Sequence, residues 1–472
     1  MRSDALDGAP EDTGPVGPVA ICALLFLLAA SPLMRGGNRH VAMIVIEAAA
    51  LAFLAALSFR AGVPRSRPGL RSVLIALLVT SPLWLGLAYL LPLPSGAWNA
   101  LPGRALYGQL LSTAGLPQQA WLPASLAPDA TLVSVLAGIP VAAAFIAGLG
   151  VRLPQLKLVL KVLVGAAFVQ VMIGLLQSAG GSGSSLYFNV EFGGRPVGTF
   201  ANTNHFANYI AMALAAYVWL AWMKLREGRR HHHHGHAAAL RRAFVIWGAG
   251  AVLLLVGILV SRSRGAAIAG LPAAMAAIGV ALTVGSRGRA WRTTLLILAG
   301  VLGVGVALVG IDALVAKFSF GAFAKDASFR TLLASTSLTG AWEFWPLGAG
   351  WGTYAEVYPR FQPASIVGAA NYAHQDYAQM LFEGGIFAAL LMAGFAWLAI
   401  TRAVELVRAA VRNRRLRREE MAATICGIGL SGFLLHSLVE FNMHIPANAI
   451  VAALFAGIYL RPLPHGEDVP GD

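Results

Sequence analysis

Three arginines stand in short polar segments of an otherwise apolar chain. Arg195 precedes a proline, and Arg262 and Arg264 share the segment Ser261–Gly265. A guanidinium group stays charged at any physiological pH and can clamp phosphate oxygens through two parallel hydrogen bonds. The three arginines are therefore candidates to bind a phosphate or diphosphate, although an arginine at a membrane surface can equally bind any lipid headgroup.

Two asparagines, Asn202 and Asn204, follow Arg195 and precede an apolar stretch that begins near Phe206. Asparagine is one of the preferred residues at a helix N-terminus, and the free amides of a first helical turn favour an anion. We therefore predict that these asparagines cap the helix and belong to the binding site of the same anionic group.

One histidine, His374, precedes a further apolar stretch, and Asp376 and Glu383 follow it. Because histidine titrates near neutral pH, it can take a proton from the hydroxyl group of a substrate. A histidine taken alone is more often structural. His374 is nevertheless a candidate for catalysis, because we expect it on the same face of the membrane as the arginines.

Four further polar residues lie at the end of the apolar stretch near residue 430. They are His436, Glu440, Asn442 and His444. Ionisable groups at the edge of a membrane span are costly and often functional. We favour a supporting role for this set over direct chemistry. The histidine run at 231–236 could bind a metal, but it lies in a basic loop away from the other polar segments, so we expect no metal or cofactor in the site.

The composition indicates an integral membrane protein. Of 472 residues, 57% are hydrophobic and only 12% are charged, whereas soluble domains carry about 25% charged residues. The net charge of +14 does not indicate a nucleic-acid partner, because the basic residues stand in short loops between apolar stretches.

Apolar runs of about 20 residues, the length that crosses a bilayer, recur along the chain. Each run must be helical, because an isolated strand would leave its backbone groups unpaired in lipid. We predict an all-α, polytopic membrane protein with about twelve transmembrane helices. The predicted spans are residues 16–34, 41–59, 72–92, 132–150, 158–176, 206–223, 243–260, 266–284, 293–311, 378–400, 421–439 and 446–460.

Basic residues concentrate in alternate loops, and the positive-inside rule then places both termini in the cytoplasm. The predicted transmembrane domain is 16–460, and 1–15 and 461–472 are predicted cytoplasmic tails, the first of them disordered. Residues 312–377 form a long periplasmic loop between the ninth and tenth spans, and their aromatic content favours order. The arginines and the histidine of the polar segments all fall on the periplasmic side.

The polar segments, taken in their order along the chain, resemble those of the O-antigen ligase and polymerase superfamily of bacterial membrane glycosyltransferases. The resemblance covers roughly residues 160–460, and the chain departs from the family pattern after Glu383, where small or apolar residues follow. The segments that carry it are Gly194–His205, Ser261–Gly265, Arg330 with Pro346–Gly350, His374–Glu383 and His436–Asn442. The resemblance implies an enzyme of the bacterial inner membrane. It would move a polyprenyl diphosphate-linked glycan, without a metal and usually with inversion, onto lipid A core, a growing polysaccharide or a protein.

The resemblance also implies roles for the candidate residues. Arg195 and Arg264 would hold the diphosphate of the donor, with Arg262 as a neighbour. His374 would orient or deprotonate the acceptor hydroxyl. The candidates to fix the tautomer of this imidazole are Asp376 and Glu383.

A transporter or flippase of an anionic lipid or solute is the alternative from another class of protein. Transport sites usually lie near the middle of the bilayer, at interrupted helices. In this sequence the charged residues cluster at the ends of the predicted spans, which favours the enzyme. A ligase and a polymerase remain equally compatible with the sequence.

The topology predicts the outcome of two reporter fusions. A periplasm-active reporter fused after Gly265 should be active, and the same reporter fused after Arg230 should be silent, because the two positions flank one predicted span. Alkaline phosphatase activity in whole cells measures both. The reverse pattern would contradict the predicted orientation.

Overall fold

The computed structural model describes residues 16–59, 70–115, 120–188, 194–230, 236–284, 320–413 and 415–462. This part of the chain is 78% helical with almost no sheet, which confirms the predicted all-α class. The N-terminal half contains α1 (Pro18–Ala30), α2 (Leu33–Gly36), α3 (His40–Ser58), α4 (Leu70–Leu90), α5 (Ser95–Ala100), α6 (Ala105–Thr113), α7 (Pro128–Gly150) and α8 (Leu153–Ala179). The remaining helices are α9 (Thr203–Arg230), α10 (His236–Val260), α11 (Leu271–Thr283), α14 (Phe320–Glu343), α15 (Tyr354–Val357), α16 (Asp376–Asn413), α17 (Arg418–His436) and α18 (Pro446–Leu460).

Eight helices of the described residues are long and apolar enough to cross a membrane. They are α3, α4, α7, α8, α9, α10, α16, and α11 with the helical turn that precedes it. The first and last predicted spans correspond to the shorter apolar helices α1 and α18. The predicted span 421–439 corresponds to α17, which is not among the eight and ends at His436. The predicted span 293–311 lies outside the described residues.

Helix α9 forms the centre of the bundle. It packs against α8, α10, α11 and α17, and 89% of its apolar window is buried inside the protein. Its buried side chains include several alanines and the fully buried Trp219. A helix buried on all sides can present its polar first turn to other protein elements instead of to lipid.

Helices α7 and α18 approach each other most closely at two glycines. A Cβ atom on Gly148 would lie closer than 3.0 Å to the carbonyl oxygen of Leu454, and one on Gly457 would crowd the carbonyl oxygen of Phe145. Small residues permit such backbone contact between membrane helices. This contact fixes the position of α18, whose N-terminus adjoins the polar residues after α17.

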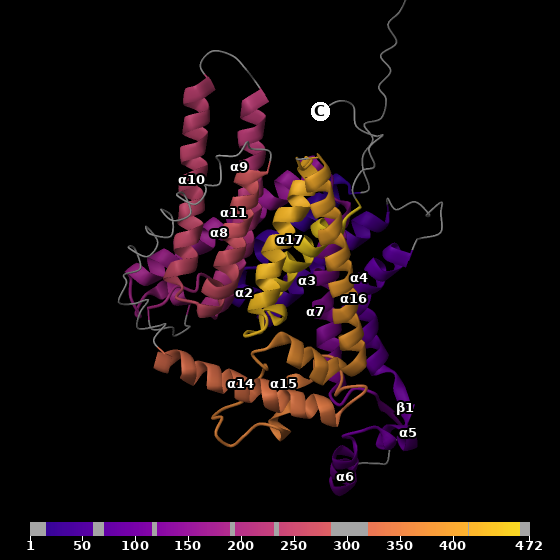
Figure 1. Ribbon diagram of the computed structural model, residues 1–472. Helices are drawn as coiled ribbons and strands as arrows, with labels where there is room; N and C mark the ends of the chain where they lie inside the picture. Colours follow the sequence, from indigo (N-terminus) through magenta and orange to yellow (C-terminus); the bar gives the residue numbers. More distant parts are fainter. Residues whose placement is uncertain are drawn as a thin grey trace, which may run out of the picture.

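One end of the bundle, which we call the site end, carries α14 and α15 (Figure 1). Helix α14 lies across this end, and Phe344, Tyr354 and Phe382 form a separate aromatic core between it and α16. Much of the predicted loop 312–377 is therefore helical and packed where the structure describes it.

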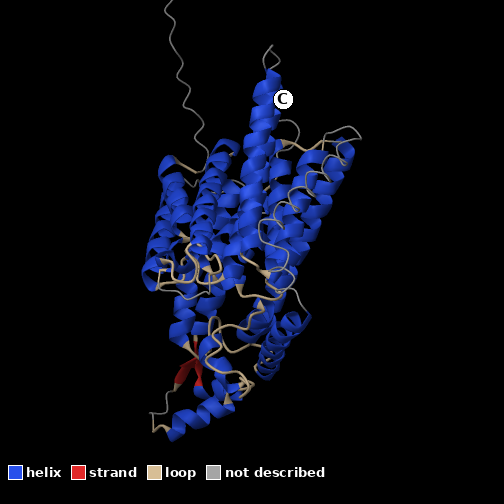
Figure 2. Cartoon of the chain, turned by 90° about the vertical axis from the view of Figure 1, so that its left-hand side faces the viewer, coloured by secondary structure: helices blue, strands red, loops and turns tan. Residues whose placement is uncertain are grey.

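The segment before α7 also lies at the site end (Figure 2). Strands β1 (Pro92–Pro94) and β2 (Trp121–Pro123) pair antiparallel, with Leu93 opposite Leu122. The buried Arg104 joins this segment to the core of the site end, because its guanidinium donates to the carbonyl oxygens of Ala124 (2.6 Å) and Gly348 (3.4 Å).

Replacement of Gly148 or Gly457 by valine should destabilise the fold by about 2 kcal/mol or more, since extra atoms in a tight contact force the backbones apart. The matched control is Gly394→Val, because a Cβ atom at Gly394 meets nothing within 4 Å. Thermal unfolding midpoints in detergent compare the three variants. Equal midpoints for Gly457→Val and Gly394→Val would contradict the proposed contact.

Candidate functional site

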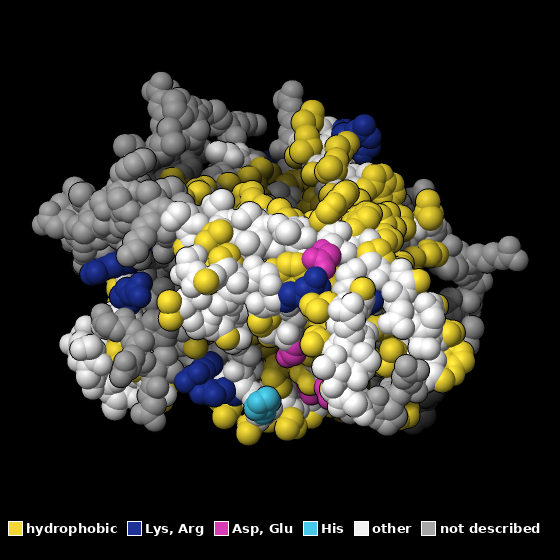
Figure 3. Space-filling view, turned by 90° about the horizontal axis from the view of Figure 1, so that it is seen from below, with side chains coloured by type: hydrophobic (Ala, Val, Ile, Leu, Met, Phe, Trp, Pro, Cys, Tyr) yellow, Lys and Arg dark blue, Asp and Glu magenta, His cyan; other side chains and the backbone are white. Residues whose placement is uncertain are grey.

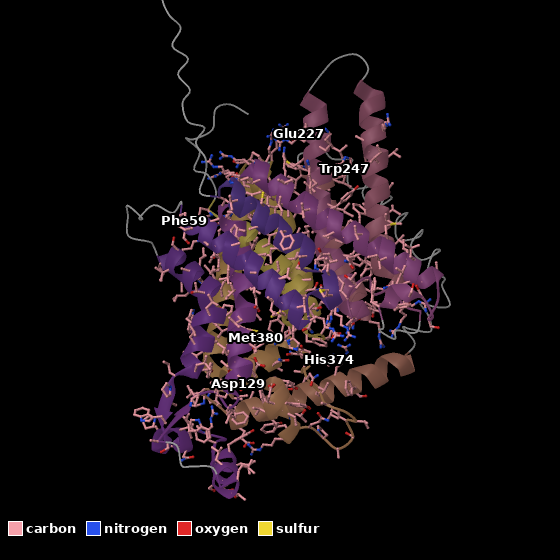
Figure 4. All side chains as sticks on the ribbon, turned by 180° about the vertical axis from the view of Figure 1, so that it is seen from behind. Phe59, Asp129, Glu227, Trp247, His374 and Met380 are labelled. Carbon is pink, nitrogen blue, oxygen red and sulfur yellow. The ribbon has the colours of Figure 1, made fainter. Side chains whose placement is uncertain are left out.

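His374 lies in the segment just before α16, between the bundle and α14 (Figure 4). Its backbone is left-handed, with φ +51°, a conformation that non-glycine residues rarely adopt. Hydrogen bonds hold the chain on both sides of it. The amide of Ala373 donates to Oε1 of Gln379 (3.1 Å), and the amide of Asp376 donates to the carbonyl oxygen of Ser437 (3.0 Å).

The carboxylate that contacts His374 is Glu440, which follows α17 and is fully buried. Its Oε1 lies 3.0 Å from Nδ1 of His374. Its Oε2 accepts hydrogen bonds from Nδ2 of Asn204 (2.6 Å) and from Nη2 of Arg330 (3.0 Å). The guanidinium of Arg330 also donates to the carbonyl oxygen of Val439. Four separated parts of the chain thus meet at one carboxylate.

These contacts keep Glu440 ionised. Burial alone would raise the pKa of Glu440, but the hydrogen bond from His374 and the positive charge of Arg330 outweigh it and hold the pKa well below its ordinary value. An ionised carboxylate can only accept hydrogen bonds. Nδ1 of His374 must therefore carry a proton in this pair, and in the singly protonated ring Nε2 is the proton acceptor.

Aromatic rings enclose the histidine. The ring of Tyr372 stacks on Phe441, with centroids 4.3 Å apart and an interplanar angle of 6°. His374 meets Phe441 edge-on at 4.7 Å, and the buried His205 of α9 does so at 4.5 Å. The side chain of His374 is 28% exposed, so a substrate can still reach the ring.

Asp376 and Glu383 do not contact His374. The buried Asp376 accepts from the amide of Met443 (2.9 Å) and lies 2.8 Å from Nδ1 of His444. It thereby ties the start of α16 to the segment that follows Glu440.

Glu383 binds the loop that precedes α15. Its carboxylate accepts from the amides of Gly352 (2.9 Å) and Tyr354 (3.2 Å), and from Nε2 of Gln379 (3.1 Å). Because Gln379 also holds Ala373, this loop and the backbone before His374 share one hydrogen-bond network. The hydrogen bonds shown for Asp376 and Glu383 thus go to the segments around His374 and not to its ring.

The segment that contains Arg195 is held by two buried glutamines of α8. Gln177 accepts from the amides of Val197 and Gly198, both at 2.9 Å, and Gln170 accepts from the amide of Thr199 (2.8 Å). Arg195 itself is partly exposed.

The asparagines that follow this segment differ in what they contact. Asn202 caps α9, because its Oδ1 accepts from the amide of Asn204 (2.7 Å). The side chain of Asn204, by contrast, points to Glu440. This pair therefore connects the arginine segment directly to the buried carboxylate.

The turn Ser261–Gly265 lies against the end of α17. A Cβ atom on Gly265 would overlap the buried ring of His436, one helical turn before Glu440. In this turn Arg262 is exposed and left-handed (φ +53°), and Arg264 is partly exposed. Seen from the site end, acidic side chains lie beside basic ones on the same face (Figure 3).

The structure gives central positions to Glu440 and Arg330. The sequence indicated Glu440 as one of four polar residues with a supporting role, and Arg330 only through the family resemblance. The signal for Glu440 is that an acidic residue at the end of an apolar helix requires a cationic partner. That partner lies 110 positions away in the chain, and no local pattern indicates it. Among the described residues, no group of three or more His, Cys, Asp or Glu could hold a metal ion.

The central part of the chain is similar to one protein family. Residues 249–393 match the family model described as O-antigen ligase, which confirms the resemblance predicted from the motifs. The matched stretch contains Arg262, Arg264, Arg330 and His374. No curated protein matches the chain.

Replacement of Glu440 by glutamine should destabilise the protein by about 3 kcal/mol, because it leaves buried donors without their charged acceptor. The control is Glu343→Gln, which removes a partly exposed ion pair with Arg360 and should cost less than about 1 kcal/mol.

The contribution of Glu440 should also depend on pH. Because its folded pKa is depressed, the contribution is present above the ordinary value of 4.5 and is lost as the pH falls toward the folded pKa. Thermal unfolding midpoints between pH 6 and pH 2.5 measure this loss, which begins near pH 4.5 and grows as the pH falls. A Glu440→Gln protein that loses as much stability on acidification as the wild type would contradict it.

Proposed function

From the match of residues 249–393 to the O-antigen ligase family, we propose that this chain transfers a glycan from a polyprenyl diphosphate-linked donor to an acceptor hydroxyl. The acceptor is lipid A core, a growing polysaccharide or a protein. We place the reaction at the periplasmic face of the inner membrane, in agreement with the distribution of basic residues in the loops. The site end would then face the periplasm.

The observation that carries the proposal is the pair of His374 and Glu440. With Nδ1 donating to the ionised carboxylate at 3.0 Å, Nε2 is the atom that takes the proton of the acceptor hydroxyl. The carboxylate stabilises the imidazolium that forms and keeps the ring oriented. General-base help of this kind typically contributes about 10²–10⁴-fold in rate.

The arginines would stabilise the leaving group. The acceptor oxygen forms a bond to the anomeric carbon, and the bond from this carbon to the diphosphate oxygen breaks. The electron pair leaves with the polyprenyl diphosphate, and attack from the opposite face inverts the anomeric carbon. Arg195 and Arg264, with Arg262 beside them, would neutralise the negative charge that develops on the diphosphate, a task that fixed cations perform without a metal.

The remaining candidates have supporting roles in this mechanism. Asn202 and Asn204 would set the position of the arginine segment relative to Glu440 through the contacts described above. Asp376 and Glu383 would keep the backbone on either side of His374 in its strained conformation. These residues would act on the geometry of the site. Their replacement would change the rate of transfer because it changes the position of His374.

Single replacement of Arg195, Arg264 or His374 by alanine should abolish most of the transfer while leaving normal amounts of folded protein. The lipid-linked donor should accumulate, because its synthesis continues while its consumption stops. For His374→Ala we expect a loss of about 10²–10⁴-fold. Surface polysaccharide on gels and extracted donor lipid by mass spectrometry measure both quantities.

The control for this experiment is Arg408→Ala, an exposed arginine on the cytoplasmic-side segment of α16. It should leave both quantities unchanged. Unchanged polysaccharide in all three site variants would reject the proposed enzyme. Loss of polysaccharide with the donor retained on the cytoplasmic leaflet would instead indicate a flippase.

A further inference from the structure

The turn between α1 and α3 contains four consecutive left-handed residues. The φ angles of Met34, Arg35, Gly36 and Gly37 are 52°, 67°, 70° and 82°. For residues with a side chain this conformation costs about 1–2 kcal/mol each. Such strain persists only where the surroundings fix the backbone, and it tends to occur at functional sites.

The contacts that fix the turn come from the proposed active site. The amide of Arg35 donates to the carbonyl oxygen of Thr199 (2.8 Å), and the hydroxyl of Thr199 donates to the carbonyl oxygen of Pro32 (2.5 Å). Gly36 lies so close to the ring of Phe200 that a Cβ atom would overlap it. The turn is therefore attached to the segment that begins with Arg195.

A second link joins the turn to the histidine. The side chain of Asn38 interacts with the hydroxyl of Tyr372, whose ring stacks on Phe441. Phe441 in turn contacts His374 edge-on. Helix α2 packs against the start of α18, where Gly36 approaches Ile445 and Gly37 approaches Pro446. The turn therefore adjoins the residues that follow Glu440, although it precedes the segments that resemble the family.

The side chains of the turn have the character of an amphiphile-binding surface. Leu33 and Met34 are 44% and 51% exposed, which places apolar groups toward the bilayer. Arg39 is exposed and Arg35 partly exposed, and the described residues offer neither guanidinium a hydrogen bond or ion pair. Arg330 and Arg360, at the same end of the protein, are both paired with carboxylates. Two cations thus stand without a counter-charge beside an apolar surface.

We propose that the turn Leu33–Arg39 binds the phosphate group of the polyprenyl-linked lipid where it enters the site from the bilayer. The isoprenoid chain lies along Leu33 and Met34, and Arg35 and Arg39 hold the phosphate beside the segment of Arg195. Arginine suits this task because its planar group binds phosphate through two hydrogen bonds and is less strongly hydrated than an ammonium group. The inference rests on the proposed function. An ordinary anionic phospholipid offers the same phosphate chemistry, so the test must separate the two lipids.

The experiment measures binding of glycan-free undecaprenyl diphosphate to the full chain in phosphatidylcholine nanodiscs. The double variant Arg35→Gln/Arg39→Gln should weaken binding about tenfold, the effect of losing charge-assisted hydrogen bonds at a partly exposed site. The control Arg408→Gln/Arg412→Gln changes two exposed arginines of α16 and should bind like the wild type. Arg35→Lys/Arg39→Lys should recover part of the affinity, because it restores the charge but not the bidentate geometry.

Nanodiscs that contain phosphatidylglycerol separate the two lipid sources. A donor site should keep its tenfold difference in them, whereas a site for any anionic headgroup should lose it, which would overturn the assignment. Suppose that Arg195→Ala and Arg264→Ala weaken binding, but a folded Arg35→Gln/Arg39→Gln variant, which elutes as a single species, binds within twofold of the wild type. This result would overturn the inference and leave the proposed function standing. If the wild type shows no saturable binding, the proposed function fails together with the inference.

Discussion

A carboxylate buried among helix ends must be paired, and the site depends on how Glu440 meets this requirement. Removing an ionised carboxylate from water costs several kcal/mol, which only close cations and hydrogen-bond donors return. Arg330, His374 and Asn204 supply them from α14, the segment before α16, and the first turn of α9. The same three contacts therefore satisfy the carboxylate, bring α14 onto the bundle and orient the imidazole. Structure and proposed chemistry share one interaction.

The position of this interaction follows from the helices that surround it. In the hydrocarbon region a helix satisfies its own backbone, but its first and last turns leave amides and carbonyl groups that need partners. At the site end two of these groups pair with side chains, because Asn202 caps α9 and the carbonyl oxygen of Val439 accepts from Arg330. The carbonyl oxygen of Ser437 accepts from the backbone amide of Asp376. Polar side chains that form hydrogen bonds with helix ends are already held at the site end. They can therefore also form a binding site at little extra cost in free energy.

The sequence predicted the fold class, which the structure confirms, and it indicated candidate segments for a site, because both rest on local properties of the chain. Apolar runs indicate helices, and arginine, asparagine and histidine beside those runs indicate a polar end. The partners within the site could not be predicted. Asp376 and Glu383 are near His374 in sequence, yet α16 turns them toward His444 and the amides of Gly352 and Tyr354. Glu440 is 66 positions from His374, and only the packing of α17 against α9 and of α14 across the bundle brings it there.

The charges at the site end divide into two groups with different tasks. Within the first group, Arg330 offsets the charge of Glu440, and Glu440 in turn binds Nδ1 of His374. A carboxylate in this position holds the imidazole ring in one orientation and would stabilise the imidazolium that forms when Nε2 takes a proton. The second group consists of Arg195, Arg262 and Arg264 with the arginines of the α1–α3 turn. Under the proposed function its task is to bind the diphosphate of the donor, because guanidinium groups clamp phosphate oxygens through two parallel hydrogen bonds.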